Sequence, residues 1–319
     1  MAITVAPDRA ANRAMVAAIV VLPTPPLPAI PMRMVHPSSS AGFVRWLTGG
    51  SRPIVGLILR LAQRGNNTKE LVMKLGVVGK GGVGKTTVSA LLARAFAARG
   101  RRVLAIDTDS NPNLGVSLGL DQQRTDAVPV LPRSLIVGAA GSATAADVVR
   151  DYGVATPAGV TLLSAIKVTD AGAGCTCAGH ASVRSLLAEV MAEQADVTLV
   201  DMEAGLEHLS RSGGTLAYAD VLLVVMEPSR KSVITAARTT ALAADLGIPL
   251  VFGVGNKARG DDEAFFTALC GEFDVPLLGV LPYDDAIPAA DRAGTALGQV
   301  PAAVDALVDA LEARTAVAG

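Results

Sequence analysis

A glycine-rich stretch that contains two lysines and two threonines, G-K-G-G-V-G-K-T-T, occupies residues 79–87. An apolar run precedes it at 75–78 and an alanine- and leucine-rich run follows it at 88–99, so the predicted order is strand, loop, helix. Glycines let the main chain approach an anion, and a helix N-terminus presents free N–H groups to it. The pattern G-x-x-x-x-G-K-T therefore predicts a phosphate-binding loop, in which Lys85 reaches the outer phosphates of ATP and the Thr86 hydroxyl ligates Mg²⁺. The expected nucleotide contacts are Gly79, Gly81, Gly82, Val83, Gly84, Lys85, Thr86 and Thr87.

Carboxylates follow two apolar runs that read as buried strands. Residues 102–106 end at Asp107, with Asp109 two residues further on, and residues 195–201 end at Asp201. Open α/β sheets bind ligands beyond the carboxyl ends of their strands. Asp201 is therefore predicted to hold the water shell of the Mg²⁺ ion. For Asp109 the competing interpretation is an Asx turn or helix cap before Pro112.

Two cysteines, Cys175 and Cys177, lie among glycines in the stretch K-V-T-D-A-G-A-G-C-T-C-A-G-H. Thiolates are soft ligands for Zn²⁺, Ni²⁺ or Cu⁺, but two of them supply only half of a tetrahedral site, and a dimer would supply the rest. Zinc sites usually have a wider spacing, so a pair without a metal stays an alternative. His180 is either a further ligand or a helix-start residue. Cys270 is expected in the core.

Alternating strands and helices must position these residues. Apolar runs predict strands at 75–78, 102–106, 160–166, 195–201, 221–226, 250–254 and 277–280, and helices at 88–99, 182–193, 232–246 and 300–313. Residues 121–158 show little periodicity. The pattern predicts one doubly wound α/β P-loop NTPase domain at 73–319, with a mostly parallel sheet of about seven strands flanked by helices.

The charge is unevenly distributed along the 319 residues. The formal net charge is −1, but residues 1–72 hold eight Lys/Arg and two Asp/Glu, which leaves 20 and 27 for the rest. An acidic domain argues against a nucleic-acid partner. Residues 300–319 contain one basic residue, Arg314, which argues against membrane targeting by an amphipathic helix. Three cysteines make no disulfide framework, and ATP dependence favours the cytoplasm.

Residues 1–72 contain eight of the 18 prolines and are expected to be a disordered or non-native extension. The apolar run 15–22 after Arg13 also permits a signal peptide, although it is too short to span a membrane. Read on the complementary strand with the frame shifted by one base, codons for residues 17–28 can spell G-K-G-G-V-G-K-T-T-I-A-A. We therefore expect the native chain to start at Met73, beside a divergent gene for a similar ATPase. Native peptides from residues 14–60 would contradict this.

Lys80, directly after the first glycine, makes the phosphate loop similar to the deviant Walker A motif of the ParA/MinD class of P-loop ATPases. The resemblance implies that Lys80 reaches the nucleotide of a partner protomer, so that ATP binding produces a homodimer. It implies a catalytic set of Lys80, Lys85, Asp109 and Asp201, in which Asp109 orients the attacking water. Gly205 would sense the γ-phosphate. The implied base contacts are Asn256, Lys257, Pro282 and Tyr283.

A more specific resemblance rests on four motifs together: this loop, the G-C-x-C at 174–177, D-M-E-A-G-L-E-H-L-S-R-S at 201–212 and M-E-P-S-R-K-S at 226–232. Together they resemble the CooC family, the nickel-insertion accessory ATPases of carbon monoxide dehydrogenase. The resemblance implies that paired Cys175 and Cys177 bind one Ni²⁺ or Zn²⁺ between protomers, and that ATP hydrolysis delivers nickel to the Ni-Fe-S cluster of the dehydrogenase. The small residues after the cysteines leave the metal and the client enzyme open.

Two other functions stay open at this point. One is a ParA/MinD-type positioning or partition ATPase, and the other is an iron-sulfur carrier ATPase whose dimer cysteines hold a cluster. A nucleotide sensor without catalysis is disfavoured because no catalytic position is lost. The sequence leaves open the roles of Glu203, Glu207 and His208, and the choice between a homodimer and a heterodimer with a similar ATPase.

Overall fold

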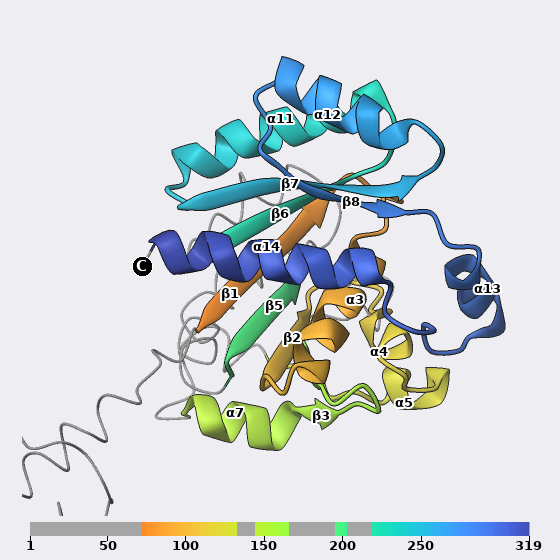
Figure 1. Cartoon of the computed structure of the whole chain (residues 1–319). Helices are drawn as coiled ribbons and strands as arrows, with labels where there is room; N and C mark the ends of the chain where they lie inside the picture. The colour runs from red at the N-terminus through yellow and green to blue at the C-terminus, as the bar shows by residue number, and fades with distance from the viewer. Residues whose placement is uncertain (1–71, 133–143, 166–194, 203–218, 319) are drawn as a thin grey trace, which may run out of the picture. The chain divides into compact units, whose positions relative to one another are not determined.

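In this computed structural model, a sheet of eight strands organises the described part of the chain (Figure 1). The structure describes residues 72–132, 144–165, 195–202 and 219–318, which belong to a contact unit spanning Asn67–Gly319. The strands are β1 (Met73–Gly79), β2 (Val103–Asp107), β3 (Val154–Ala155), β4 (Thr161–Ser164), β5 (Val197–Asp201), β6 (Val221–Met226), β7 (Leu250–Ala258) and β8 (Leu277–Pro282).

The strand order is β3-β4-β2-β5-β1-β6-β7-β8, and every neighbouring pair is parallel except β3 with β4. The predicted doubly wound, mostly parallel sheet is thus confirmed. The additional strand is β3, a two-residue edge strand in the part of the sequence that lacks periodicity. Strand β2 lies to one side of β1 and β6 to the other, so the chain changes direction at β1. In such sheets ligands bind at this switch point, beyond the carboxyl ends of the strands.

Helices cover both faces of the sheet (Figure 1). Helices α3 and α14 pack into one hydrophobic cluster, and α7, α11 and α12 pack into the other. The short helices α4, α5 and α13 lie toward the carboxyl ends of the strands. The bounds are α3 (Lys85–Ala98), α4 (Leu114–Ser117), α5 (Gln122–Asp126), α7 (Ala145–Tyr152), α11 (Arg230–Asp245), α12 (Asp262–Glu272), α13 (Ala286–Ala293) and α14 (Ala302–Ala318).

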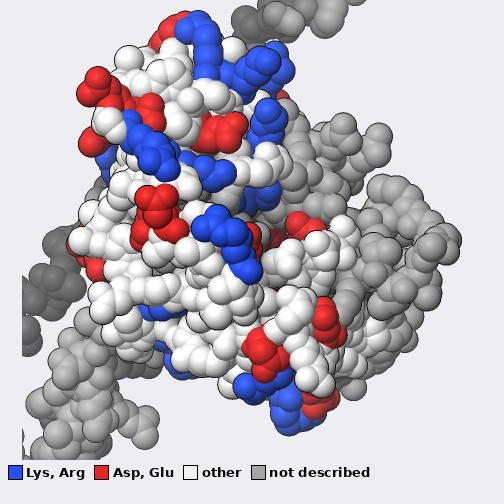
Figure 2. All heavy atoms as spheres, turned by 90° about the vertical axis from the view of Figure 1, so that its right-hand side faces the viewer, with Lys and Arg blue, Asp and Glu red and all other residues white. Residues whose placement is uncertain are grey.

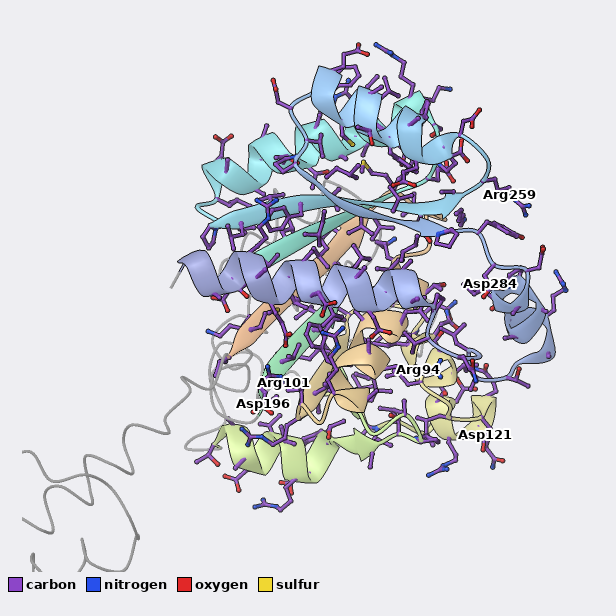
Figure 3. The ribbon with its side chains drawn as sticks, viewed as in Figure 1. Arg94, Arg101, Asp121, Asp196, Arg259 and Asp284 are labelled. Atoms are coloured by element: carbon purple, nitrogen blue, oxygen red, sulfur yellow. The ribbon has the colours of Figure 1, made fainter. Side chains whose placement is uncertain are left out.

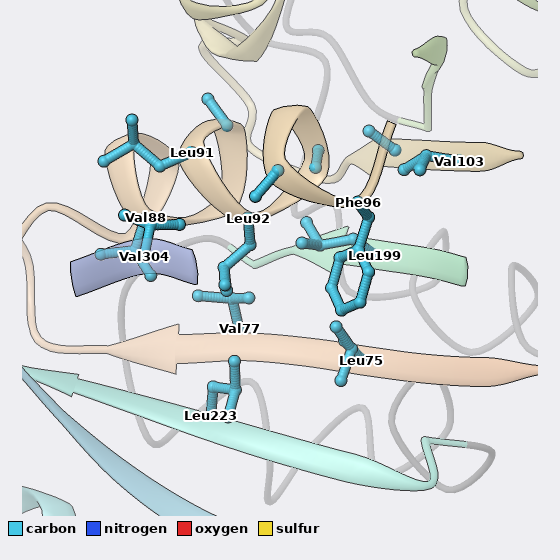
Figure 4. Close-up of a cluster of buried hydrophobic side chains, with 14 of the residues drawn as sticks. Leu75, Val77, Val88, Leu91, Leu92, Phe96, Val103, Leu199, Leu223 and Val304 are labelled. Atoms are coloured by element: carbon cyan, nitrogen blue, oxygen red, sulfur yellow. The ribbon is translucent and has the colours of Figure 1, made fainter. Parts of the chain in front are cut away.

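Strand β1 shows how the apolar pattern divides between the two faces. Leu75 and Val77 belong to the cluster under α3, whereas Val78 belongs to the opposite cluster, because successive side chains of a strand alternate. Figure 4 shows Phe96 of α3 directed at Leu75 and Leu199. A parallel sheet covered on both faces needs strands that are apolar on both sides, as these are.

Two of the differences from the expected element boundaries affect the site. Helix α3 begins at Lys85 rather than 88, because Gly84 takes the left-handed conformation (φ 94°) that ends the loop. Strand β7 continues to Ala258, which pairs with Pro282 of β8, so Asn256 and Lys257 lie in the strand and not in a loop. The predicted helix at 182–193 falls outside the described residues. The expected core position of Cys270 is confirmed, since it is 2% exposed.

Of the helices that the structure describes, none combines the length and the apolar character needed to cross a bilayer.

We expect Phe96→Ala to lower the free energy of unfolding by about 3–5 kcal/mol, because it leaves a cavity between α3 and the sheet. Phe96 is 1% exposed. Phe265→Ala is the matched control, since Phe265 is only partly buried on the rim of the opposite cluster. Chemical denaturation of both variants measures the difference. Equal losses would contradict the assignment of Phe96 to the centre of the core.

Candidate functional site: a nucleotide cleft at the carboxyl ends of the strands

The predicted phosphate loop connects β1 to α3, with its glycines in conformations that other residues rarely adopt. Gly84 has φ 94°, and a Cβ atom there would come within 2.4 Å of the Asn256 side-chain nitrogen. A Cβ atom on Gly79 would lie 2.5 Å from the Val225 carbonyl oxygen. The loop therefore packs too tightly against β6 and β7 to accept side chains at these positions. The amides at the start of α3 stay available to an anion.

The two lysines of the loop differ in environment. Lys85 is 8% exposed, and its Nζ donates to the Lys80 carbonyl oxygen at 3.4 Å. Its ammonium group is thus already held within the loop, where outer phosphates would lie. Lys80 itself is exposed on the surface. It does not contribute a described side-chain contact to its own loop, and its predicted reach to a partner protomer stays a prediction.

Two buried carboxylates face each other at the ends of adjacent strands. Asp107 ends β2 and Asp201 ends β5, and the two residues are direct partners in the parallel register. They are 2% and 1% exposed. The Ser89 hydroxyl of α3 donates to Asp201 Oδ1 at 3.0 Å. The sequence did not single out Ser89, although its position one turn after Thr86 puts both hydroxyls on the same helix face.

Burial raises the pKa of both carboxyl groups. Desolvation raises the pKa of Asp107 to about 6, against hydrogen bonds from backbone amides that lower it. Desolvation, followed by the charge of Asp107, raises the pKa of Asp201 to about 7, although hydroxyls of Thr86 and Ser89 and the charge of Lys85 act in the other direction. Two carboxylates in such a site favour a proton or a cation between them.

The same residues fit a divalent cation. Magnesium prefers oxygen ligands and typically uses one or two carboxylates together with phosphate oxygens. Thr86 and Asp201, hydrogen-bonded to each other, supply a hydroxyl and a carboxylate at the phosphate loop, and their predicted role as Mg²⁺ ligands stays a prediction. Within the described residues, no group of three or more His, Cys, Asp or Glu side chains forms a metal site without substrate.

Asp107 also shapes the loop that carries Asp109. Its carboxylate accepts from the amide of Asp109 at 3.0 Å and from the amide of Leu114, the first residue of α4, at 3.1 Å. Asp109 in turn accepts from the Asn111 amide at 2.9 Å, the Asx turn that was its alternative interpretation. Asp109 nevertheless lines the cleft. The Asx turn is thus confirmed, and the catalytic role of Asp109 stays a prediction.

Asn256 and Lys257, predicted to contact the base, both hold the phosphate loop through their side chains. Asn256 Nδ2 donates to the Val83 carbonyl oxygen at 2.8 Å, and Lys257 Nζ donates to that of Gly82 at 2.6 Å. Lys257 also has φ 61°, which is uncommon for a residue with a side chain. The end of β7 therefore braces the loop, and the predicted contact of these residues with a base stays a prediction.

The phosphate loop opens into a cleft of about 610 Å³. One wall comes from α4 and α5 and the other from the segment 282–297, which contains the predicted base contacts Pro282 and Tyr283. The guanidinium of Arg259 lies 3.6 Å from the centre of the Tyr283 ring. No sequence signal pointed to Arg259, because the contact joins two strand ends that are far apart in sequence. The lining residues include Gly81, Gly82, Gly84, Lys85, Thr86, Thr87, Asp109, Asn113, Ser117, Gln122, Asn256, Lys257, Pro282, Tyr283, Asp284 and Leu297.

Figure 3 shows that Arg94, Asp121, Arg259 and Asp284 lie toward this side of the molecule, whereas Arg101 and Asp196 lie at the opposite ends of the strands. Figure 2 views the same side as a surface and shows Lys and Arg side chains interspersed with Asp and Glu. A second hollow, of about 290 Å³, is lined by Arg99, Arg101, Asp196 and Glu312. Arg99 and Arg101 both pair with Glu312, so we assign this hollow no ligand.

The remaining predicted site residues fall outside the described residues. These are the cysteine pair, the γ-phosphate sensor and the residues without an assigned role: Cys175, Cys177, His180, Glu203, Gly205, Glu207 and His208. Their roles stay predictions.

Comparison with known proteins supports a nucleotide site. A model of the CobQ/CobB/MinD/ParA nucleotide-binding domain matches residues 76–297. The chain is 40% identical over 237 residues to the carbon monoxide dehydrogenase accessory protein CooC of Rhodospirillum rubrum, covering 70% of this chain and 88% of that protein. It is 33% identical over 229 residues to an uncharacterized ATP-binding protein of Methanocaldococcus jannaschii, covering 67% and 87% of the two chains. The crystal structure of the cell division ATPase MinD of Pyrococcus furiosus superposes with a TM-score of 0.58 at 25% identity, covering 76% of this chain and 99% of that one.

We expect Asp201→Asn to stabilise the nucleotide-free protein at pH 8. A carboxyl group whose pKa is raised from 3.8 to about 7 on folding contributes stability below pH 4 that is lost as the pH rises through 7. At about 1.4 kcal/mol for each unit of pKa, the variant should gain on the order of 2–4 kcal/mol at pH 8 and little at pH 4. Denaturation at several pH values, with a chelator present, measures this gain.

Asp196→Asn is the control of opposite sign. Its hydrogen bonds and ion pair with Arg102 lower the pKa of Asp196, so its contribution is present at neutral pH and lost on acidification. This variant should therefore be less stable than the parent at pH 8. A gain at pH 8 from Asp196→Asn, or a loss from Asp201→Asn, would contradict the assigned environments.

We expect Asn256→Ala to weaken ATP binding about tenfold, since an unpaired buried carbonyl at Val83 costs about 1–3 kcal/mol and releases the phosphate loop. Titration calorimetry with ATP and Mg²⁺ measures the change. Asp261→Ala, at the N-cap of α12, where its side chain makes no capping hydrogen bond, is the control. An unchanged affinity of Asn256→Ala for ATP would contradict the proposed role of Asn256 in holding the phosphate loop.

Proposed function

The chain belongs to the CobQ/CobB/MinD/ParA family of nucleotide-binding domains and, within it, to the P-loop ATPases of the CooC group, and from this premise we propose that it is a metallochaperone. It hydrolyses ATP to deliver nickel to carbon monoxide dehydrogenase or a related nickel enzyme. The observation that carries the proposal is the 40% identity over 88% of a carbon monoxide dehydrogenase accessory protein. The cysteine pair Cys175 and Cys177 supplies the ligands that such a cargo requires.

The ATP site follows from the cleft. The phosphates bind the amides of residues 81–87 and the Lys85 ammonium, and the base lies between Asn256 and the Pro282–Tyr283 wall. Thr86 and Asp201 hold Mg²⁺, which neutralises phosphate charge when bound. Asp109, fixed in its turn, orients the attacking water. Positioning and electrostatic stabilisation of this kind supply most of what phosphoryl transfer requires.

We propose dimerisation from the position of Lys80. Its side chain is exposed beside the glycines of the phosphate loop, on the surface that faces away from the domain core. A second protomer placed over this cleft receives the Lys80 ammonium at its own nucleotide. Four thiolates, two from each protomer, then complete one tetrahedral site for Ni²⁺ or Zn²⁺. Hydrolysis of ATP removes the closed arrangement and releases the metal to the client. ATP dependence places this work in the cytoplasm.

A second candidate is supported by the similarity to MinD, the cell division ATPase. In that case the ATP-dependent dimer serves positioning and carries no metal. An iron-sulfur carrier differs again, because its dimer would bind a coloured, redox-active cluster. Metal analysis separates the three functions.

The experiment measures metal stoichiometry and mass of the full chain, purified without oxygen, with and without a slowly hydrolysed ATP analogue. We expect one Ni²⁺ or Zn²⁺ ion per dimer with nucleotide, and monomers with little metal without it. Cys175→Ser/Cys177→Ser should abolish metal binding and retain ATP hydrolysis. Cys270→Ala is the matched control, since this buried thiol is not part of the pair.

Three results would overturn the proposal. Metal binding that is unaffected by the double substitution would remove the cysteine site. A nucleotide-dependent dimer without any metal would favour the positioning ATPase, and a brown dimer with iron would favour the cluster carrier.

A further inference from the structure

Arg94 of α3 forms two hydrogen bonds with the main chain of the loop between α13 and α14. Its Nη1 donates to the Leu297 carbonyl oxygen at 2.9 Å and its Nη2 to that of Gly298 at 2.7 Å. Within the described part of the chain, no carboxylate pairs with this guanidinium. Two parallel bonds from one planar group fix both the position and the orientation of the peptide they hold.

The arginine is unusual among its neighbours in having only neutral partners. It is half-buried, and burial lowers the pKa of Arg94. Arg99 at the end of the same helix instead pairs with Asp305 and Asp309 of α14. Burying a guanidinium costs hydration free energy, and neutral carbonyl partners offset less of this cost than a carboxylate would. A contribution to stability alone therefore explains the arrangement poorly. The two hydrogen bonds of Arg94 instead fix the position of the loop between α13 and α14.

That loop forms part of the cleft wall. Gly294, Thr295 and Leu297 line the cleft. Leu297 is 8% exposed and packs in the hydrophobic cluster that contains Val83 and Val88. Helix α13, just before the loop, has no buried residue. The wall therefore has few anchors, and segments with few buried contacts open easily. Arg94 and Leu297 are two of these anchors.

The other end of α3 holds the phosphates, through Lys85 and Thr86. Arg94 lies nine residues further along, roughly 13 Å at 1.5 Å per residue of helix. We propose that Arg94 is a positioning residue, which sets the wall 294–297 at a fixed distance from the phosphate loop and so supports binding of the nucleoside part of ATP. The inference rests on the proposed binding of ATP in this cleft. Arg94 itself touches the wall and not the nucleotide.

The test compares two ligands of the full chain. ATP carries phosphates, ribose and base, whereas inorganic tripolyphosphate carries only the phosphates. We expect Arg94→Ala to raise the KM for ATP about tenfold with kcat unchanged within about twofold, which is the pattern of lost uniform binding. Inhibition by tripolyphosphate should stay within about twofold of the parent. Arg94→Lys, which lacks the fork, should give an intermediate KM.

Arg99→Ala is the control, because it removes links between α3 and α14 without touching the cleft wall. It should change neither KM nor inhibition. Equal weakening of ATP and tripolyphosphate in Arg94→Ala, or an unchanged KM, would overturn the inference while leaving ATP binding intact. Failure of the parent chain to hydrolyse ATP would overturn the proposed function and this inference with it. Circular dichroism of each variant confirms that a changed KM does not reflect unfolding.

Discussion

The site depends on two carboxylates that the sheet forces together. The register of β2 and β5 puts Asp107 opposite Asp201, and the surrounding strands exclude water from both. Without a cation the pair is costly, and the raised pKa values of about 6 and 7 express that cost. A Mg²⁺ ion brought with a nucleotide would relieve it. The protein thus stores an unfavourable charge where the substrate supplies its counterpart, a common arrangement in functional sites.

Helix α3 connects the phosphate loop at one end of the cleft to the wall at the other end. Its first residues meet the phosphates, Ser89 donates to Asp201, and Arg94 holds the far wall. Strand β7 acts from the other side, since Asn256 and Lys257 bond to loop carbonyls. The phosphate loop is therefore fixed by its own helix and by a neighbouring strand. Such preorganisation reduces the cost of ordering the loop when a ligand binds.

The sequence predicted those features that local patterns encode. Apolar runs identified the strands, and the glycine-lysine-threonine pattern identified the phosphate loop, because both depend on neighbouring residues. The short edge strand β3 was missed, since its pairing comes from β4 and not from its own two residues. The sequence also could not predict the contact partners of Asn256, Arg259 and Arg94. Each bonds to a segment distant in sequence, and only the assembled sheet brings those segments together.

The carboxylate pair also lies where the predicted functional segments begin. The Ala165 amide, at the last described residue before the cysteine-bearing segment, donates to the Asp107 carbonyl oxygen at 2.9 Å. The amide and the hydroxyl of Thr108 both donate to the Asp201 carbonyl oxygen, one residue before Met202, after which the segment with Gly205 starts. The main chain at the two carboxylate positions is therefore hydrogen-bonded within one residue of the points where both segments begin.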